Sequence, residues 1–599
     1  MNRSLILLCL PFLFPSLALQ AKADLGAYVS EDAWGVFEIE NLEALSKDFR
    51  NGPFANLWTE KAEAKLVEWW EEEALPKGRE KRENAQELIE RMRELAEKFK
   101  GSVTFSIGGD FGEILEALAA DEEEDAIPEI LLLAETEATM EDLAEFVEWL
   151  EDFNEEDADL RVEEEKVAGK TVFFIGPSEP RDEEHCFGIS IVNGVFCAGV
   201  GRTLAIDAVE RLVDEPDGGL TNNPDYEDAF EAIGRGDLRF FLNFRVLGPI
   251  FAFLKQSEAT QIPENPFGVT TAGLIDALAL DGLECLGLQI DFSDKGMEVG
   301  SALFLGERTG LLALLESTDG APPMPPFVPA GAFSATTVRY DLKGLWPKLE
   351  KVLKEASPAL HLMVDGQIKA FETQAGVNLR KDLFGSLGDR VVTFSETGYA
   401  SGSEFAEALL NDLEEAEDDD LPLPPEESPL KEVYAIGLRD GQALDRFIRG
   451  VVDAFAQGTE LFDEREHKGV TIRTMKGTEA TGQFFSYAIT SEWLLLSMGK
   501  ASGLNQVVNR LNKARKTLWN RPDVAAALRE APPGVSQWDY LDLSGLTDFL
   551  LPLIDMALEE EMGETLFGEN LPKLPYFMLG WTRDETRGLV SRLSVYSKE

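Results

Sequence analysis

The most informative stretches of this sequence are Gly169-Lys-Thr-Val-Phe-Phe-Ile175 and Gly469-Val-Thr-Ile-Arg-Thr-Met475, which lie about 300 positions apart. Both contain the β-branched and aromatic residues that favour strands. Predicted hairpins follow both stretches: Ile189-Ser-Ile-Val-Asn-Gly-Val-Phe-Cys197 in the first half and Tyr487-Ala-Ile-Thr-Ser-Glu-Trp-Leu-Leu495 in the second. A predicted helix then follows each hairpin. Elements that recur in one order at a similar spacing indicate an internal repeat.

Further matches between the two halves keep the same order. They are Val103-Thr-Phe-Ser106 with Val392-Thr-Phe-Ser395, Leu42 and Leu45 with Leu342 and Leu345, Leu143 and Phe146 with Leu444 and Phe447, and Asn223-Pro-Asp225 with Arg521-Pro-Asp523. The spacing drifts by several residues, as expected when surface loops gain and lose residues while the elements persist. We therefore predict two tandem homologous modules.

The fold class follows from the kind of elements in each module. Asn193-Gly194 has the composition of a two-residue hairpin turn, which would place Ser190 opposite Cys197. A 3.6-residue period over 85–99 predicts an amphipathic helix that ends at Gly101. Hairpins and helices without a regular β-α-β alternation predict the α+β class. We expect each module to be a mainly antiparallel curved sheet with helices covering one face.

The first residues predict a secretory signal peptide. Arg3 precedes an apolar stretch from Leu5 to Leu19, and Ala21-Lys22-Ala23 offers the small residues that signal peptidase needs. We expect cleavage after residue 23 and export to the periplasm or the extracellular space. A membrane-spanning helix needs about 20 apolar residues, and no later stretch approaches that length. We therefore expect no integral membrane span after cleavage.

The rest of the chain divides at a proline-rich segment. We predict module 1 at 24–317, a stiff linker at 318–329 and module 2 at 330–599, with an acidic, proline-rich insertion at 404–429. The insertion is expected to be a solvated loop. An exposed aromatic pair, Trp69-Trp70, is a candidate contact for an apolar ligand, or else part of an amphipathic helix that packs on its own module.

The composition excludes some partners. The chain has 111 acidic and 55 basic residues, a net charge of −56, and such a charge repels nucleic acid and anionic lipid headgroups. An apolar content of 44% with 37 Phe residues is enough for a folded core, so the acidity does not indicate disorder. It indicates either a soluble surface or a surface that attracts cations.

The residues that usually carry catalysis are sparse. The three histidines, His185, His361 and His467, fall in different predicted elements. Cys186 and Cys197 would lie too far apart along one hairpin for a disulfide. Gly169-Lys170-Thr171 lacks the first glycine of a phosphate-binding loop, and neither 214–218 nor 291–296 has the glutamate that ends a calcium loop. We therefore predict no catalytic, cofactor-binding or metal-binding residue and no cofactor.

One family resemblance rests on motifs of the second half. His467-Lys-Gly-Val-Thr-Ile472, Tyr487-Ala-Ile489, Trp493-Leu-Leu-Leu-Ser497 and Phe327-Val-Pro-Ala330 resemble motifs of an uncharacterised family of exported bacterial proteins, known as a domain of unknown function. The resemblance covers the second module and, more faintly, the first. It implies the compartment and the fold, but no activity and no site residue.

Three functions remain open at this point. The sequence favours an exported protein that is not an enzyme and that binds an unknown protein partner or an apolar ligand. The first alternative is a hydrolase that uses carboxylate chemistry. The second alternative is an acidic surface or structural protein that binds cations.

Overall fold

The computed structural model describes residues 24–53, 55, 87, 90–109, 112, 128–154, 160–177, 186–214, 219–256, 262–263, 265–293, 296–397, 430–456, 460–476, 485–498, 502–511, 516–548, 551–552 and 573–598. The chain divides into two compact units. Unit 1 comprises Met1–Phe253 and Leu283–Leu305, and unit 2 comprises Leu254–Gly282 and Gly306–Glu599. The fold is of the mixed α+β class, as the sequence predicted.

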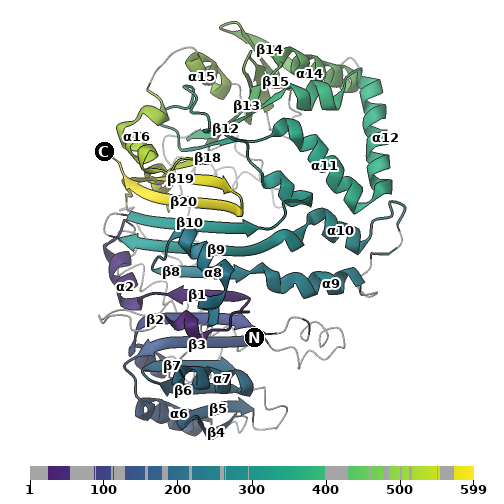
Figure 1. Ribbon diagram of the computed structural model, residues 1–599. Helices are drawn as coiled ribbons and strands as arrows, with labels where there is room; N and C mark the ends of the chain where they lie inside the picture. Colours follow the sequence, from purple (N-terminus) through teal and green to yellow (C-terminus); the bar gives the residue numbers. More distant parts are fainter. Residues whose placement is uncertain are drawn as a thin grey trace, which may run out of the picture. The chain divides into compact units, whose positions relative to one another are not determined.

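Unit 1 contains an antiparallel sheet with the order β4-β5-β6-β7-β3-β2-β1-β8-β9-β10 among its described residues (Figure 1). The strands are β1 (Gly35–Ile39), β2 (Phe99–Gly108), β3 (Glu129–Thr136), β4 (Leu160–Val167), β5 (Lys170–Pro177), β6 (Phe187–Val192), β7 (Val195–Val200), β8 (Leu238–Asn243), β9 (Leu283–Ser293) and β10 (Gly296–Leu305). The helices that pack on this sheet are α2 (Leu42–Asn51), α6 (Met140–Asn154), α7 (Arg202–Val213) and α8 (Pro224–Ile233).

Unit 2 contains an antiparallel sheet with the order β14-β15-β16-β17-β13-β12-β11-β18-β19-β20 in the described part of the chain. The strands are β11 (Ser334–Arg339), β12 (Leu387–Thr397), β13 (Leu430–Leu438), β14 (Phe462–His467), β15 (Val470–Met475), β16 (Phe485–Ile489), β17 (Trp493–Met498), β18 (Val535–Asp542), β19 (Tyr576–Glu585) and β20 (Gly588–Ser597). Its helices include α10 (Thr271–Leu278), α11 (Leu342–Ala356), α12 (Pro358–Ala375), α14 (Gly441–Ala456), α15 (Ser502–Leu511) and α16 (Pro522–Glu530). Helix α9 (Gly248–Gln256) contains the point where the chain passes from one unit to the other.

The hairpin turns have the conformations that their residues favour. Asn193 and Gly194 both have positive φ angles, 53° and 83°, and join β6 to β7 with Ser190 opposite Cys197. This is the predicted turn, and asparagine and glycine are the residues that adopt it at least cost. Lys468-Gly469 makes a similar turn between β14 and β15, with φ angles of 50° and 80°.

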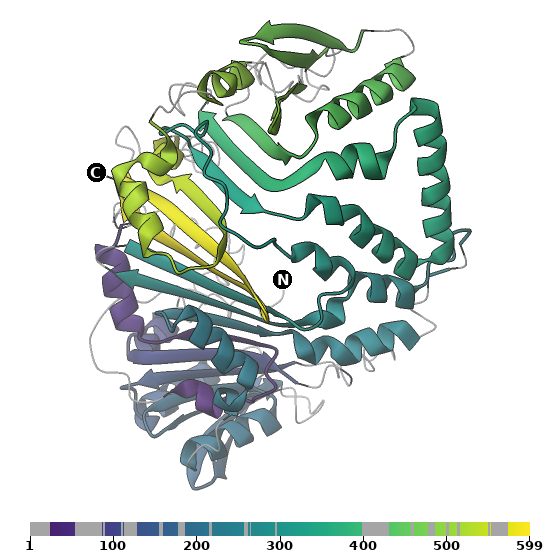
Figure 2. The ribbon, with the colours of Figure 1, turned by 45° about the horizontal axis from the view of Figure 1, so that its top comes forward.

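Each sheet is covered on both faces, and not on one face as we expected. In unit 1, α6 packs on one face around Leu143 and Phe196, while α7 and α8 pack on β6, β7, β9 and β10. In unit 2, α14 covers one face around Leu444 and α15 and α16 cover the other around Leu504 and Val524. Figure 2 shows α16 lying over the strands β18–β20. The reason is visible in β7, where three consecutive residues, Val195–Cys197, are buried, a pattern that requires cover on both faces.

The predicted helix at 85–99 ends earlier than expected. Its described part ends at residue 96, and Phe99 already begins β2. Gly101 does not end the helix but lies within β2 with a φ angle of 81°, where the pairing with β3 is irregular. Glycine at this position therefore allows the positive φ angle that the irregular pairing of the strand requires.

Several sequence predictions lie outside the described residues. These are the signal peptide at 1–23, the Trp69-Trp70 pair, His185 and the acidic insertion at 404–429. The proline-rich segment 318–329 is described: Phe327 and Val328 are fully buried in the core of unit 2.

Candidate functional site

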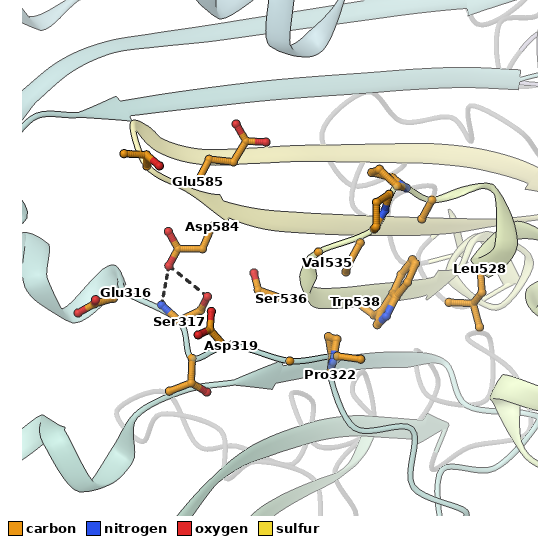
Figure 3. A pocket seen from close by; sticks show the side chains of 18 of the residues that line it. Glu316, Ser317, Asp319, Pro322, Leu528, Val535, Ser536, Trp538, Asp584 and Glu585 are labelled. Carbon is orange, nitrogen blue, oxygen red and sulfur yellow. Dashed lines mark hydrogen bonds between the residues drawn. The ribbon is translucent and has the colours of Figure 1, made fainter.

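Unit 2 contains a cavity of about 870 Å³ (Figure 3). Four parts of the unit line it: Gly306 with Arg308, the segment 316–324, the chain from the end of α16 into β18, and the end of β19 with the residues that follow it. The sequence predicted none of its residues as a site. The segment that we interpreted as a linker supplies one of its walls.

The wall at α16 and β18 is shaped by backbone chemistry. Helix α16 ends at Glu530, and Pro532-Pro533 follows, which cannot continue a helix. Gly534, directly before β18, then adopts a φ angle of 85°, a conformation in which glycine is the least strained residue. These residues, with Leu528, Val535 and Trp538, form an apolar surface of the cavity.

A network around Asp584 forms the polar end of the cavity. Arg308 Nη1 lies 2.5 Å from Asp584 Oδ1, and Arg308 Nη2 donates to the backbone carbonyl of Glu585 at 2.7 Å. Asp584 Oδ2 also accepts from the backbone nitrogen of Ser317 at 2.7 Å and from its hydroxyl at 3.1 Å (Figure 3). The network therefore fixes segment 316–318 to the end of β19.

Two other lining carboxylates have cationic partners. Lys348 Nζ lies 3.0 Å from Glu316, and Arg583 lies 2.7 Å from Glu585. Asp319 is exposed and has no ion-pair partner among the described residues. Arg308 is mostly buried in its pair with Asp584. The cavity thus has one uncompensated charge on its described lining, and this charge is negative.

Among the described residues, the lining of the cavity offers no activated nucleophile. No histidine, cysteine or lysine occurs among the described residues that line the cavity. Ser317 donates to a carboxylate that Arg308 already holds, and the Ser536 hydroxyl donates to the carbonyl of Thr582 at 3.0 Å. A serine nucleophile needs a free base within hydrogen-bond reach, and neither hydroxyl has one in this network.

The two described histidines lie away from the cavity lining. His361, in α12, has Nε2 at 3.5 Å from Glu350. His467, at the end of β14, makes a 3.0 Å hydrogen bond with Asn509. Cys186, Cys197 and Cys285 form no disulfide among the described residues, and Cys197 and Cys285 are buried. Burial raises the pKa of Cys197 to about 12, so its reactive thiolate form is disfavoured.

Unit 1 contains a separate buried polar group. Glu38 is 2% exposed, accepts a 2.5 Å hydrogen bond from the Tyr226 hydroxyl and lies 3.3 Å from Arg239 Nε. Burial raises the pKa of Glu38 although Arg239 and Tyr226 act to lower it, and burial also raises the pKa of Tyr226. Because these groups are enclosed in the core beneath α8, we interpret them as structural.

Two further properties apply to the described part of the chain. No group of three or more histidine, cysteine, aspartate or glutamate side chains there is arranged to hold a metal ion. Within the same residues, no helix combines the length and the apolar character that crossing a membrane requires.

Comparison with known proteins gives little. No protein-family model matches the chain, and no curated protein matches it. Among solved structures, crystal forms I, III and IV of TP0453 are similar, with 13%, 12% and 12% sequence identity and TM-scores of 0.21, 0.23 and 0.22. The matches cover 48%, 48% and 47% of this chain and 81%, 81% and 79% of TP0453. TM-scores this low carry no conclusion about function.

Proposed function

We propose that this chain is an exported, non-enzymatic binding protein made of two copies of one module, and that the cavity of unit 2 holds its ligand. The cavity is the observation that carries the proposal. Its volume lies within the range of small-molecule sites, which are about 300 to 1,000 Å³, mostly apolar and fitted with a few polar groups. The cavity agrees with that description in volume and in its fixed polar end at Asp584, while polar and apolar surface contribute about equally to its lining.

The duplication is supported by the strand order. The order in unit 2 repeats the order in unit 1 strand for strand, with β11 in the place of β1 and β20 in the place of β10. Helices also stand at matching places in the chain order of the two copies: α2 and α11, α6 and α14, and α7 and α15 each follow a matching strand, and α8 and α16 precede β8 and β18. Membership in the uncharacterised exported family belongs to the same proposal, and it rests on the motifs of the second module.

The function is tested by native mass spectrometry of the mature protein purified from its own host. We expect a chain that starts near Asp24 and carries an excess mass that is lost on denaturation. A start at Met1 would contradict export, and a mass equal to a metal ion would favour the cation-binding alternative.

A pair of variants connects the bound mass to the cavity. Ala321 is exposed and lines the cavity, so Ala321→Trp should fill the space without disturbing the core, whereas Ala321→Ser should leave it open. We expect the tryptophan variant to lose the excess mass and the serine variant to keep it. Retention of the mass by both variants would show that the ligand lies elsewhere, and a bare wild-type chain would refute a constitutively carried ligand.

A further inference from the structure

We propose that the ligand of the unit 2 cavity is a small amphiphile with one cationic group, an ammonium, on an apolar body. This inference rests on the proposed function and names the chemical class that the cavity would accept. It follows from three features: the charge that the lining leaves unpaired, the lack of a free cation there, and the separation of polar from apolar walls.

The ion pairs of the lining indicate which sign of charge the ligand carries. The described lining has four carboxylates, those of Glu316, Asp319, Asp584 and Glu585, and one guanidinium, that of Arg308. Arg308 is committed to Asp584 and to the Glu585 carbonyl, while Lys348 and Arg583 hold the carboxylates of Glu316 and Glu585. What remains for a ligand is the carboxylate of Asp319.

An anionic ligand would meet no available partner. It would have to displace Asp584 from Arg308, and Asp584 also accepts two hydrogen bonds from Ser317. Breaking such a network leaves charged groups unpaired, which costs several kcal/mol. The net charge of −56 adds a long-range field that raises the local concentration of cations and lowers that of anions. Fatty acids and phosphorylated ligands are therefore disfavoured.

The apolar body of the ligand would contact a separate, apolar wall of the cavity. In Figure 3, Asp319, Asp584 and Glu585 lie toward one end of the cavity, while Trp538 and Leu528 lie toward the other. Pro532, Pro533, Val535 and Met324 extend the apolar lining. A ligand with an apolar body and one ammonium could bury its body against Trp538 and keep its charge near Asp319. Burial of the body would provide most of the affinity, at about 25 cal/mol per Å² of apolar surface.

The test compares three probes of the same length by isothermal titration calorimetry on the mature protein: octylammonium, octanoate and 1-octanol. We expect octylammonium to bind once per chain, octanol to bind more weakly, and octanoate to bind at least about tenfold more weakly than octylammonium. Asp319→Asn should weaken octylammonium binding by about three- to fivefold, the effect of one exposed ion pair, and should leave octanol binding unchanged. Glu492→Gln is the matched control, because it removes one exposed carboxylate that does not line the cavity.

The outcomes separate this inference from the proposed function. Equal binding of octanoate and octylammonium, or equal effects of Asp319→Asn and Glu492→Gln, would overturn the cationic class and leave a binding cavity. Failure of all three probes to bind would refute the cavity as an amphiphile site. Binding that persists in Ala321→Trp would place it outside the cavity and would also overturn the inference.

Discussion

In each unit, one row of mainly buried side chains crosses four neighbouring strands, and the residue types in the row differ between the two units. In unit 1 the row follows the pairing of β2, β1, β8 and β9 and contains Thr104, Glu38, Arg239 and Gln289. In unit 2 it follows β12, β11, β18 and β19 and contains Val392, Thr337, Trp538 and Trp581. The helix above the row contributes Tyr226 in unit 1 and Val524 in unit 2, both fully buried.

The difference shows what the fold requires at these positions. Both rows keep the same strand pairing, although one contains an ion pair and the other contains two indole rings. A buried ion pair and a well-packed apolar replacement of similar volume differ little in stability, because desolvation offsets most of the attraction between the charges. The backbone arrangement therefore depends on side chains that fill the space in the row. Whether an ion pair or aromatic rings fill it matters less.

Among the variants of these rows, Glu38→Ala should have the largest effect on stability. The substitution removes the partner of the Tyr226 hydroxyl and leaves the buried guanidinium of Arg239 without its carboxylate. We expect unit 1 to lose about 3 to 5 kcal/mol of stability. Hydrogen–deuterium exchange read by mass spectrometry should show faster exchange in the strands of unit 1. The strands of unit 2 act as an internal reference.

Two further variants identify the cause of that loss. Glu38→Gln keeps a side-chain oxygen that can accept from both Tyr226 and Arg239, so it should not show the loss of stability of Glu38→Ala. The triple variant Glu38→Thr, Arg239→Trp and Tyr226→Val gives unit 1 the side chains of unit 2 at three of the five compared positions. It should recover most of the stability that Glu38→Ala loses. If the triple variant is no more stable than Glu38→Ala, the side chains of the two rows are not interchangeable. Filling the space in the row would then not be enough to keep unit 1 stable.

A smaller effect concerns the start of the helix above each row. Asn223 caps α8 by accepting from the backbone nitrogens of Asp225 and Tyr226, at 2.9 and 3.2 Å. Arg521 stands at the same place before α16 and makes no capping bond, but it donates to the Tyr540 hydroxyl at 2.8 Å. We expect Asn223→Ala to destabilise unit 1 by about 1 kcal/mol.

The control for this prediction is Asn223→Asp, which retains a capping acceptor. Thermal unfolding monitored by circular dichroism, with exchange in α8 as the local measurement, checks both variants. Equal losses for alanine and aspartate would mean that the other bond of Asn223, to the carbonyl of Glu31 at 2.8 Å, matters more than the cap.

The sequence predicted the hairpins and the order of elements well, because those features depend on local chemistry. Asn193-Gly194 allows few conformations other than the observed turn. The cover of both faces was missed, because consecutive buried residues such as Val195–Cys197 give no alternating pattern that would identify one face.

The motif Val-Thr-Phe-Ser occurs in both halves, but its two copies differ by one residue in their position on the sheet. Val103 packs with Leu143 on the α6 face, whereas Val392 packs with Leu504 on the α15 face. Side chains alternate between faces along a strand, so a shift of one residue reverses the face. The strand pairing places Thr104, and not Val103, in the row position that corresponds to Val392. Burial therefore indicates the strand register more reliably than the identity of these four residues does.

The cavity was not predictable from local patterns. Its carboxylates come from segment 316–319 and from the end of β19, more than 260 positions later. In a chain with 111 acidic residues, no spacing distinguishes these from the others. Only the tertiary fold shows that Arg308, Lys348 and Arg583 leave Asp319 without a partner among the described residues.

The smallest expected effect is a difference in pH dependence between the two units. Burial raises the pKa of Glu38 above its ordinary value of 4.5. The stabilising contribution of this group is therefore fully present below about pH 4.5 and declines as the pH rises through the raised pKa. In unit 2, burial acts to raise the pKa of Asp523, but the hydrogen bond from Arg521 lowers it below 3.8. That contribution is present above about pH 3.8 and declines as the pH falls.

The pH dependence that Glu38 contributes and the one that Asp523 contributes can each be removed by one substitution. Glu38→Gln should match the wild type at pH 4 and become relatively more stable as the pH rises, whereas Asp523→Asn should match it at low pH and become relatively less stable as the pH rises. Melting temperatures between pH 3 and pH 8 measure both differences. Slopes of the same sign for the two variants would mean that the charged row of unit 1 responds to protons as an ordinary ion pair, and that its burial does not control its titration.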